Sequence, residues 1–277
     1  MSPEVRGFVR SADGTSIAVH TLGGDGPDLI VLGGTLQDAG NYAGLGQLLS
    51  RDFTVHILDR RGRGRSGPHG CEYSLAKEAE DLAAIQASTG ARLAFGQSYG
   101  GLILLEALTR GLTLSAASVF EPGVSIDGSI ETDWLSDYRE RLARGDARGA
   151  FARFIGSNPH APAITRLVPL WCLRAALGAM PGFPARIAPL LAGNALEHEQ
   201  ITLRDNTLNA YQTIRTRLQL LAGGKSPKDV IDTVGRLRSV IPDAEAVVIP
   251  GLRHRSPTTR RPAALAGVIR DYLADGR

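Results

Sequence analysis

The chain has 277 residues and a formal net charge of +3, with 43% hydrophobic and 21% charged residues. Such a composition is typical of a globular protein that builds its own core. The charge is small and the arginines are dispersed along the chain, which argues against a nucleic-acid partner. The two cysteines, Cys71 and Cys172, match no metal or redox spacing, so we expect free thiols in a reducing compartment.

The longest apolar segment, residues 166–180, is too short to span a membrane and is interrupted by Arg166, Pro169 and Arg174. The N-terminal residues contain no apolar stretch of the length that a signal peptide needs. We therefore expect a cytoplasmic protein without a membrane partner.

In chain order, alternating apolar residues on both sides of Asp13-Gly14 predict a β-hairpin. Short apolar runs then predict four strands, and helical spacing predicts two helices among them. These are strands 28–34, 53–59, 92–96 and 114–122 and helices 73–88 and 101–111. Strands that alternate with helices are typical of a parallel sheet with helices on both faces.

The alternation stops near residue 127, and only helical patterns follow as far as residue 217. Strand and helix patterns then return, with strands at 218–224 and 244–251, each followed by a helix. The sequence therefore predicts one α/β domain, residues 1–126 and 218–277, interrupted by an all-helical insertion at residues 127–217.

Gly96-Gln97-Ser98-Tyr99-Gly100 lies between a predicted strand and a predicted helix, which is the context that a G-x-S-x-G nucleophile elbow requires. The two glycines leave room for a strained serine backbone, and the next helix directs its N-terminus at developing negative charge. Ser98 is therefore the candidate nucleophile. The alternative is a plain turn of glycine and serine.

A serine nucleophile needs a base, normally a histidine. Among the six histidines, His254 follows a predicted strand and should reach the same sheet edge as Ser98. The alternative for His254 is a histidine of a surface loop. The others lie inside strands, in a loop or in the insertion, and we expect them to be structural: His20, His56, His69, His160 and His198.

An oxyanion hole needs backbone N–H donors, typically from the residue after the nucleophile and from a loop after an early strand. Tyr99 follows Ser98. The second donor should be Thr35, because Gly33 and Gly34 let the chain turn tightly before it.

Four segments resemble the α/β-hydrolase fold superfamily: GGTLQD, DRRGRGRSG, GQSYGG and PGLRH. The resemblance covers nearly the whole chain. It implies an α/β-hydrolase fold, a serine nucleophile, and a cap domain in the helical insertion that roofs the active site. The family usually has His-Gly where this chain has Gly33-Gly34, and its acid usually follows the seventh strand, where this chain has Gly223-Gly224-Lys225.

A lysine cannot orient an imidazolium, so the acid of the triad must come from another place. Glu121 ends the strand next to that of Ser98, and some members of the superfamily carry their acid there. Asp229, in the helix after the seventh strand, is the second candidate, although a carboxylate is also common at a helix N-terminus. An orienting acid could also be missing.

The other motifs in the sequence do not indicate a dinucleotide, nucleic-acid or metal site. Residues 62–67 match G-x-G-x-x-G, but Pro68 continues the loop where a dinucleotide site needs a helix. The arginines of residues 60–65 are expected in a solvated loop. No spaced cluster of ligands indicates a metal, and we expect no cofactor. Three aromatic residues are candidates for the substrate pocket, with packing as the other interpretation: Tyr42, Trp134 and Trp171.

The sequence thus predicts a cofactor-independent serine hydrolase that cleaves a small-molecule ester, lactone or thioester with Ser98, His254 and Glu121. A C–C hydrolase or an acyl-transferring cyclase with the same triad stays open. So does a small-molecule-binding protein on a hydrolase scaffold, with slow or no turnover. The sequence indicates neither the substrate nor the oligomeric state.

Overall fold

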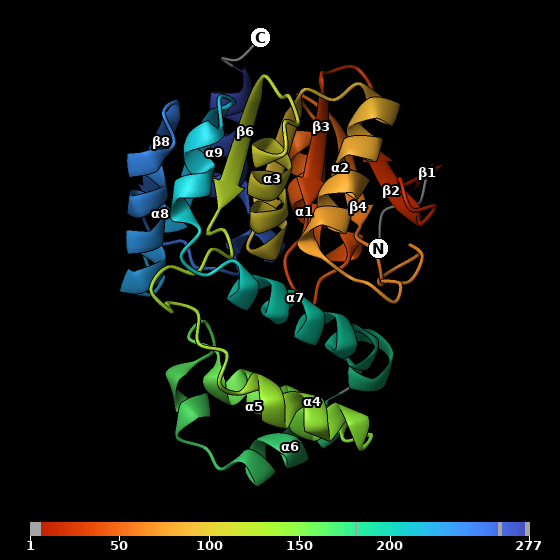
Figure 1. Ribbon diagram of the computed structural model, residues 1–277, viewed down its shortest axis with the longest axis vertical. Helices are drawn as coiled ribbons and strands as arrows, with labels where there is room; N and C mark the ends of the chain where they lie inside the picture. Colours follow the sequence, from red (N-terminus) through yellow and green to blue (C-terminus); the bar gives the residue numbers. More distant parts are fainter. Residues whose placement is uncertain (1–6, 181, 260–261, 275–277) are drawn as a thin grey trace.

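The computed structural model describes residues 7–180, 182–259 and 262–274. Eight strands form one sheet, which lies between helices in the upper part of Figure 1. They are β1 (Gly7–Arg10), β2 (Ser16–Leu22), β3 (Asp28–Leu32), β4 (Thr54–Asp59), β5 (Leu93–Gln97), β6 (Ala116–Phe120), β7 (Arg217–Gly223) and β8 (Ala244–Ile249).

The strand order is β1-β2-β4-β3-β5-β6-β7-β8. The pairs β1–β2 and β2–β4 are antiparallel, and the other neighbouring strands are parallel. Strands β3 to β8 therefore all end at the same edge of the sheet, where the loops that follow them meet. The predicted α/β fold and the hairpin around Asp13-Gly14 are confirmed.

The helices are α1 (Ala43–Leu49), α2 (Leu75–Thr89), α3 (Tyr99–Thr109), α4 (Leu135–Ala143), α5 (Ala147–Ser157), α6 (Leu170–Gly178), α7 (Leu191–Leu203), α8 (Lys228–Val240) and α9 (Ala263–Ala274). Shorter helical turns are η1 (Ala39–Tyr42), η2 (Ala163–Arg166), η3 (Phe183–Ile187), η4 (Ala188–Leu190), η5 (Leu208–Thr213) and η6 (Ser256–Thr258). None of the described helices is both long and apolar enough to cross a membrane.

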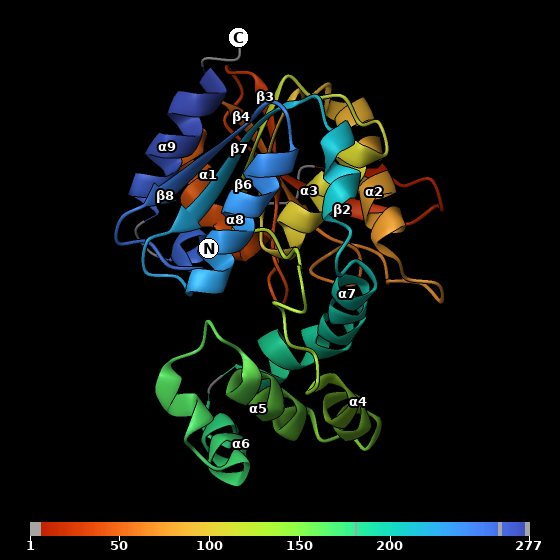
Figure 2. The ribbon, with the colours of Figure 1, turned by 60° about the vertical axis from the view of Figure 1, so that its left-hand side comes forward.

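Helices α1 and α9 cover one face of the sheet, and α2, α3 and α8 cover the other (Figure 2). Strand β3 shows the cause, because its successive side chains point to opposite faces. Leu29 and Val31 belong to the core under α1 and α9, whereas Ile30 and Leu32 belong to the core on the other side.

Helix α1 has no counterpart among the elements that the sequence predicts. Gly44 and Gly46 lower its helix propensity and hide the pattern. Packing explains Gly46, since a Cβ there would lie 2.7 Å from Ile57 Cδ1 and 2.8 Å from Leu22 Cδ1. Packing against Ile57 and Leu22 therefore requires glycine at position 46, although glycine is unfavourable in a helix.

Between β6 and β7 the described chain contains only helices and loops. Helices α4, α5 and α6 form a layer apart from the sheet, and α7 lies between that layer and the sheet (Figures 1 and 2). This cap has a core of its own that includes Trp134, Tyr138, Phe154, Phe183 and Leu191.

Candidate active site

Ser98 lies on a sharp turn between β5 and α3. Its backbone has φ 53° and ψ −122°, a strained conformation for a residue with a side chain. The flanking glycines permit the turn. A Cβ on Gly96 would lie 2.7 Å from the carbonyl oxygen of Gly100, and one on Gly100 would lie 2.5 Å from that of Leu32. The turn has the form of a nucleophile elbow and brings Ser98 to the wall of a cavity.

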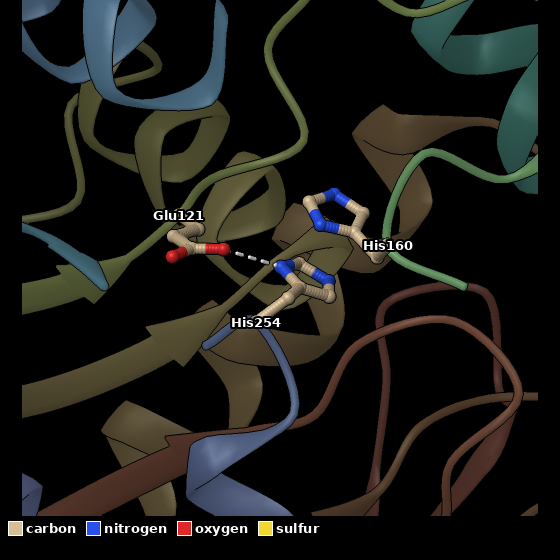
Figure 3. Close-up of side chains that lie close together, drawn as sticks. All are labelled: Glu121, His160 and His254. Atoms are coloured by element: carbon tan, nitrogen blue, oxygen red, sulfur yellow. Dashed lines mark hydrogen bonds and ion pairs between the residues drawn. The ribbon is translucent and has the colours of Figure 1, made fainter. Parts of the chain in front are cut away.

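His254 and Glu121 form a hydrogen-bonded pair at the same cavity, with 2.7 Å between His254 Nδ1 and Glu121 Oε2 (Figure 3). Glu121 follows β6 directly and His254 lies in the loop after β8, so parallel strands deliver both residues to one edge of the sheet. The Glu121 side chain is completely buried, and 18% of the His254 side chain is exposed. A histidine that bonds a carboxylate through Nδ1 keeps Nε2 for proton exchange with a nucleophile.

Further donors hold the Glu121 carboxylate. The Gly223 N–H and the Ser226 hydroxyl donate to Oε1, at 2.7 and 2.5 Å. Burial alone would raise the pKa of Glu121, but the hydrogen bonds from His254, Ser226 and Gly223 lower it below its ordinary value. The segment after β7 therefore supports the Glu121 carboxylate with two donors. Asp229, the second candidate, is exposed in the first turn of α8 and makes no hydrogen bond with His254 among the described residues.

The loop of residues 33–38 lies against the elbow. A Cβ on Gly34 would lie 3.0 Å from Ser98 Cβ, so glycine lets the two backbones approach. Across the described residues, the N–H groups of Thr35 and Tyr99 donate to no protein acceptor. Free N–H groups beside a nucleophile are what an oxyanion hole requires, and these are the two donors that the sequence indicates.

Gly34 is hydrogen-bonded through both of its backbone groups. Its N–H donates to the Tyr42 hydroxyl at 2.9 Å. Its carbonyl oxygen accepts from Arg60 Nη2 at 3.1 Å and from Arg63 Nη1 at 3.0 Å. These bonds fix the peptide that joins Gly34 to Thr35, which carries the proposed oxyanion donor.

Glu197 of α7 binds both arginines from the cap. Its Oε1 lies 2.7 Å from Arg60 Nη2 and also accepts from Arg63 Nη2. Burial alone would raise the pKa of Glu197, but the two guanidinium groups lower it, so it stays charged. The expectation of a solvated loop at residues 60–65 is therefore wrong for Arg60, Arg61 and Arg63, which are buried because each has a carboxylate partner.

The cavity at Ser98 encloses about 820 Å³ of empty space, part of it open to solvent, between the core and the cap. Trp134 lines it, as expected for a pocket residue. The expectation is corrected for the other two aromatic residues. Tyr42 is completely buried behind the loop of residues 33–38, where its hydroxyl is needed as a hydrogen-bond partner, and Trp171 is 73% exposed on α6.

The cap places His160 against the ring of His254. The rings of His160 and His254 stack with 3.9 Å between centroids and 16° between planes (Figure 3). Burial and the neighbouring His254 lower the pKa of His160 to about 3, so its ring is uncharged at neutral pH. The sequence does not indicate this contact, because His160 lies in a loop, residues 158–162, whose position depends on how the cap docks.

The model of the alpha/beta hydrolase family matches residues 23–268. The chain belongs to this family. An alpha/beta hydrolase from Sphaerobacter thermophilus is 29% identical, with a TM-score of 0.80 over 96% of this chain and 100% of that structure.

Two curated relatives are also hydrolases. A 2-(acetamidomethylene)succinate hydrolase of Mesorhizobium japonicum is 26% identical over 83% of this chain and 82% of its own. A pimeloyl-(acyl-carrier protein) methyl ester esterase of Xanthomonas campestris is 32% identical over 48% of this chain, which spans about half of that relative (53%). The family and these relatives make the chain a hydrolase.

One group of three side chains in the described part of this hydrolase could meet a metal ion: Glu121, His160 and His254, with one ligand atom of each within 4.8 Å of the others. The geometry does not favour a metal there. Two parallel stacked rings do not direct their lone pairs at one point, and His254 Nδ1 is already bonded to Glu121.

Removing the stacked ring should slow the hydrolase moderately. We expect His160→Ala to lower kcat about fivefold, because an aromatic stack that holds the base in place contributes about 1 kcal/mol. His160→Phe keeps a flat, uncharged ring and should stay within about twofold of the wild type. Steady-state kinetics on one ester checks both. If Phe lowers kcat as much as Ala, a ring nitrogen of His160 acts, and its stacking does not.

Proposed function

We propose that the chain is a cofactor-independent serine hydrolase that cleaves a small-molecule ester, lactone or thioester. The observation that carries the proposal is the 2.7 Å hydrogen bond between His254 and Glu121 at the cavity that also holds Ser98 on its strained turn. The family and its esterase relatives support the same chemistry. A cap over the site is consistent with a small substrate.

In the proposed reaction, Ser98 Oγ attacks the carbonyl carbon while His254 Nε2 takes its proton. The negative charge that develops on the carbonyl oxygen meets the N–H groups of Thr35 and Tyr99, each worth about 3 kcal/mol in the transition state. His254 returns the proton to the leaving oxygen or sulfur as the acyl-enzyme forms. Water, deprotonated by the same nitrogen, then attacks the acyl-enzyme; the acyl–Oγ bond breaks, His254 returns the proton to Ser98 Oγ, and the acid leaves. Glu121 stays charged throughout and holds the imidazolium.

The substrates named for the relatives cannot be assigned to this chain. One acts on a succinate derivative and another on a methyl ester carried by a protein, at 26% and 32% identity. Contacts with the cap determine which group of a substrate reaches Ser98. At such low identity, the cap residues that make these contacts can differ between the proteins. The substrate must therefore be argued from the cavity itself.

A fluorophosphonate probe tests the nucleophile without knowledge of the substrate. We expect one covalent adduct per chain by intact-mass measurement, and none on Ser98→Ala, because only a serine activated by a base reacts readily with such probes. Ser129→Ala is a matched control, since Ser129 lines the same cavity without belonging to the triad, and it should still be labelled.

A well-folded wild-type protein that gives no adduct would contradict the proposal. That result would favour a small-molecule-binding protein on the hydrolase scaffold, whose ligand response should survive Ser98→Ala.

A further inference from the structure

The cavity at Ser98 carries no cationic side chain that could bind an anionic substrate. None of its described lining residues is a lysine or an arginine, although the chain contains 31 of them. Two carboxylates line it in addition to Glu121: Glu131 from the cap and Asp229 from the first turn of α8. Both are exposed, so they stand where the cavity meets solvent.

The two histidines of the cap do not supply a positive charge either. His198 Nδ1 lies 2.8 Å from the carbonyl oxygen of Asn194, and burial lowers the pKa of His198. His160 stacks on His254, and burial and that neighbour lower its pKa to about 3. Both rings are therefore uncharged at neutral pH.

The arginines that contact the loop of residues 33–38 are already paired with carboxylates. Arg60 and Arg63 bind the Gly34 carbonyl of the loop of residues 33–38 from behind, where Glu197 pairs with both and Glu78 pairs with Arg60. The N-terminus of α8 could attract an anion through its dipole, but Asp229 already places a carboxylate there. A negatively charged substrate would thus meet carboxylates and, among the described lining residues, no lysine or arginine.

The remaining lining is apolar or neutral. Its apolar part includes Val124, Ile130, Trp134, Phe154, Ile201 and Val230. Such a surface accepts uncharged groups and disfavours the transfer of a carboxylate from water.

We propose that the substrate of this hydrolase carries no negative charge: an ester or lactone whose acyl and leaving groups are free of carboxylate and phosphate. The inference rests on the proposed function and narrows its substrate class.

A matched pair of substrates tests the charge alone. 4-Nitrophenyl pentanoate and the mono-4-nitrophenyl ester of glutaric acid share the reacting ester and the chain length, and differ in a terminal methyl against a carboxylate. We expect kcat/KM for the pentanoate to exceed that for the glutarate monoester by at least about tenfold, because like charges in a partly desolvated site repel strongly. An equal or larger value for the glutarate monoester would overturn the proposal.

Variants locate the origin of the discrimination. The double variant Glu131→Gln with Asp229→Asn should narrow the ratio at least about threefold, because two of the repelling charges are removed. Asp232→Asn is the control, since Asp232 lies on the same helix, pairs with Lys228 and does not line the cavity. It should leave the ratio of the two substrates as it is.

The failure of the charge proposal and that of the hydrolase proposal are distinguishable. Two fluorophosphonates, one with an alkyl tail and one with a tail that ends in a carboxylate, report the same preference as rates of Ser98 labelling, without turnover. Labelling by the alkyl probe at least about tenfold faster supports the inference. Faster or equal labelling by the carboxylate probe refutes the charge proposal alone, and no labelling by either probe refutes the serine hydrolase.

Discussion

Glu121→Gln should lower kcat by about three to four orders of magnitude, because an amide in this place imposes the wrong tautomer on His254. The Gly223 N–H donates to Oε1 of Glu121, so the amide of a glutamine must turn its oxygen to that donor. Its NH₂ group then faces His254 Nδ1, which must accept. The proton moves to Nε2, and His254 can no longer take one from Ser98.

Asp229→Asn provides the comparison for this prediction. Asp229 is exposed and has no bond with His254 in the described structure, so we expect less than about a threefold change in kcat, as for a surface substitution. Pre-steady-state and steady-state rates with one ester, together with thermal unfolding of each variant, give the ranking. A larger loss in Asp229→Asn than in Glu121→Gln would refute the assignment of the acid.

The pH profile of kcat should contain no step from the ionisation of Glu121. Its hydrogen bonds lower its pKa below the ordinary value, so the charged form persists as the pH falls. The stability that this carboxylate contributes is complete above its unfolded-state pKa and is lost as the pH falls from there through its folded-state pKa. Glu121 therefore stays ionised through the range in which an unperturbed histidine titrates, near pH 6.5.

The sequence predicts those parts of the site that follow from local structure. Ser98, Glu121 and His254 each come just after a strand, and the carboxyl ends of parallel strands meet at one edge of the sheet. The proposed triad can therefore be predicted from strand patterns and one motif. Tyr42 shows the limit of this reasoning, because a tyrosine near a catalytic loop can face the cavity or, as here, lie behind it.

The parts that the sequence does not predict depend on the docking of the cap. Arg63 and Glu197 are 134 residues apart, and no local pattern indicates that they meet. Arginines in a glycine-rich loop are normally solvated, so the burial of Arg63 cannot be predicted without the cap carboxylate that pairs with it. His160 is equally hidden, since its loop has no regular structure that fixes its direction.

Arg63→Lys should lower kcat by about a hundredfold with little change in KM, although residue 63 does not line the cavity. Arg63 donates to the carbonyl oxygens of both Gly34 and Gln37, at 3.0 Å each, while its other nitrogen binds Glu197. A single ammonium cannot make this set of bonds.

The effect should appear in kcat because the carbonyl of Gly34 and the N–H of Thr35 belong to one peptide. Donors on that carbonyl fix the orientation of the N–H and polarise it toward the oxyanion. This matters in the transition state, where the negative charge is present, and much less when the substrate binds.

Glu197→Gln should also lower kcat, because Glu197 holds the two arginines in place. It should in addition lower the free energy of unfolding by about 3 kcal/mol, because it leaves buried cations with less compensation.

Arg61→Lys separates this positioning effect from loss of stability. Arg61 is also completely buried and binds two carboxylates, Asp81 and Asp13, but in the described structure it makes no hydrogen bond or ion pair with the loop of residues 33–38. It should destabilise the fold and leave kcat within about threefold, measured well below the unfolding temperature. A boronic acid that forms a tetrahedral adduct on Ser98 should bind more weakly to Arg63→Lys, in proportion to kcat, and nearly unchanged to Arg61→Lys. Equal losses in both variants would show that the buried arginines only stabilise the fold.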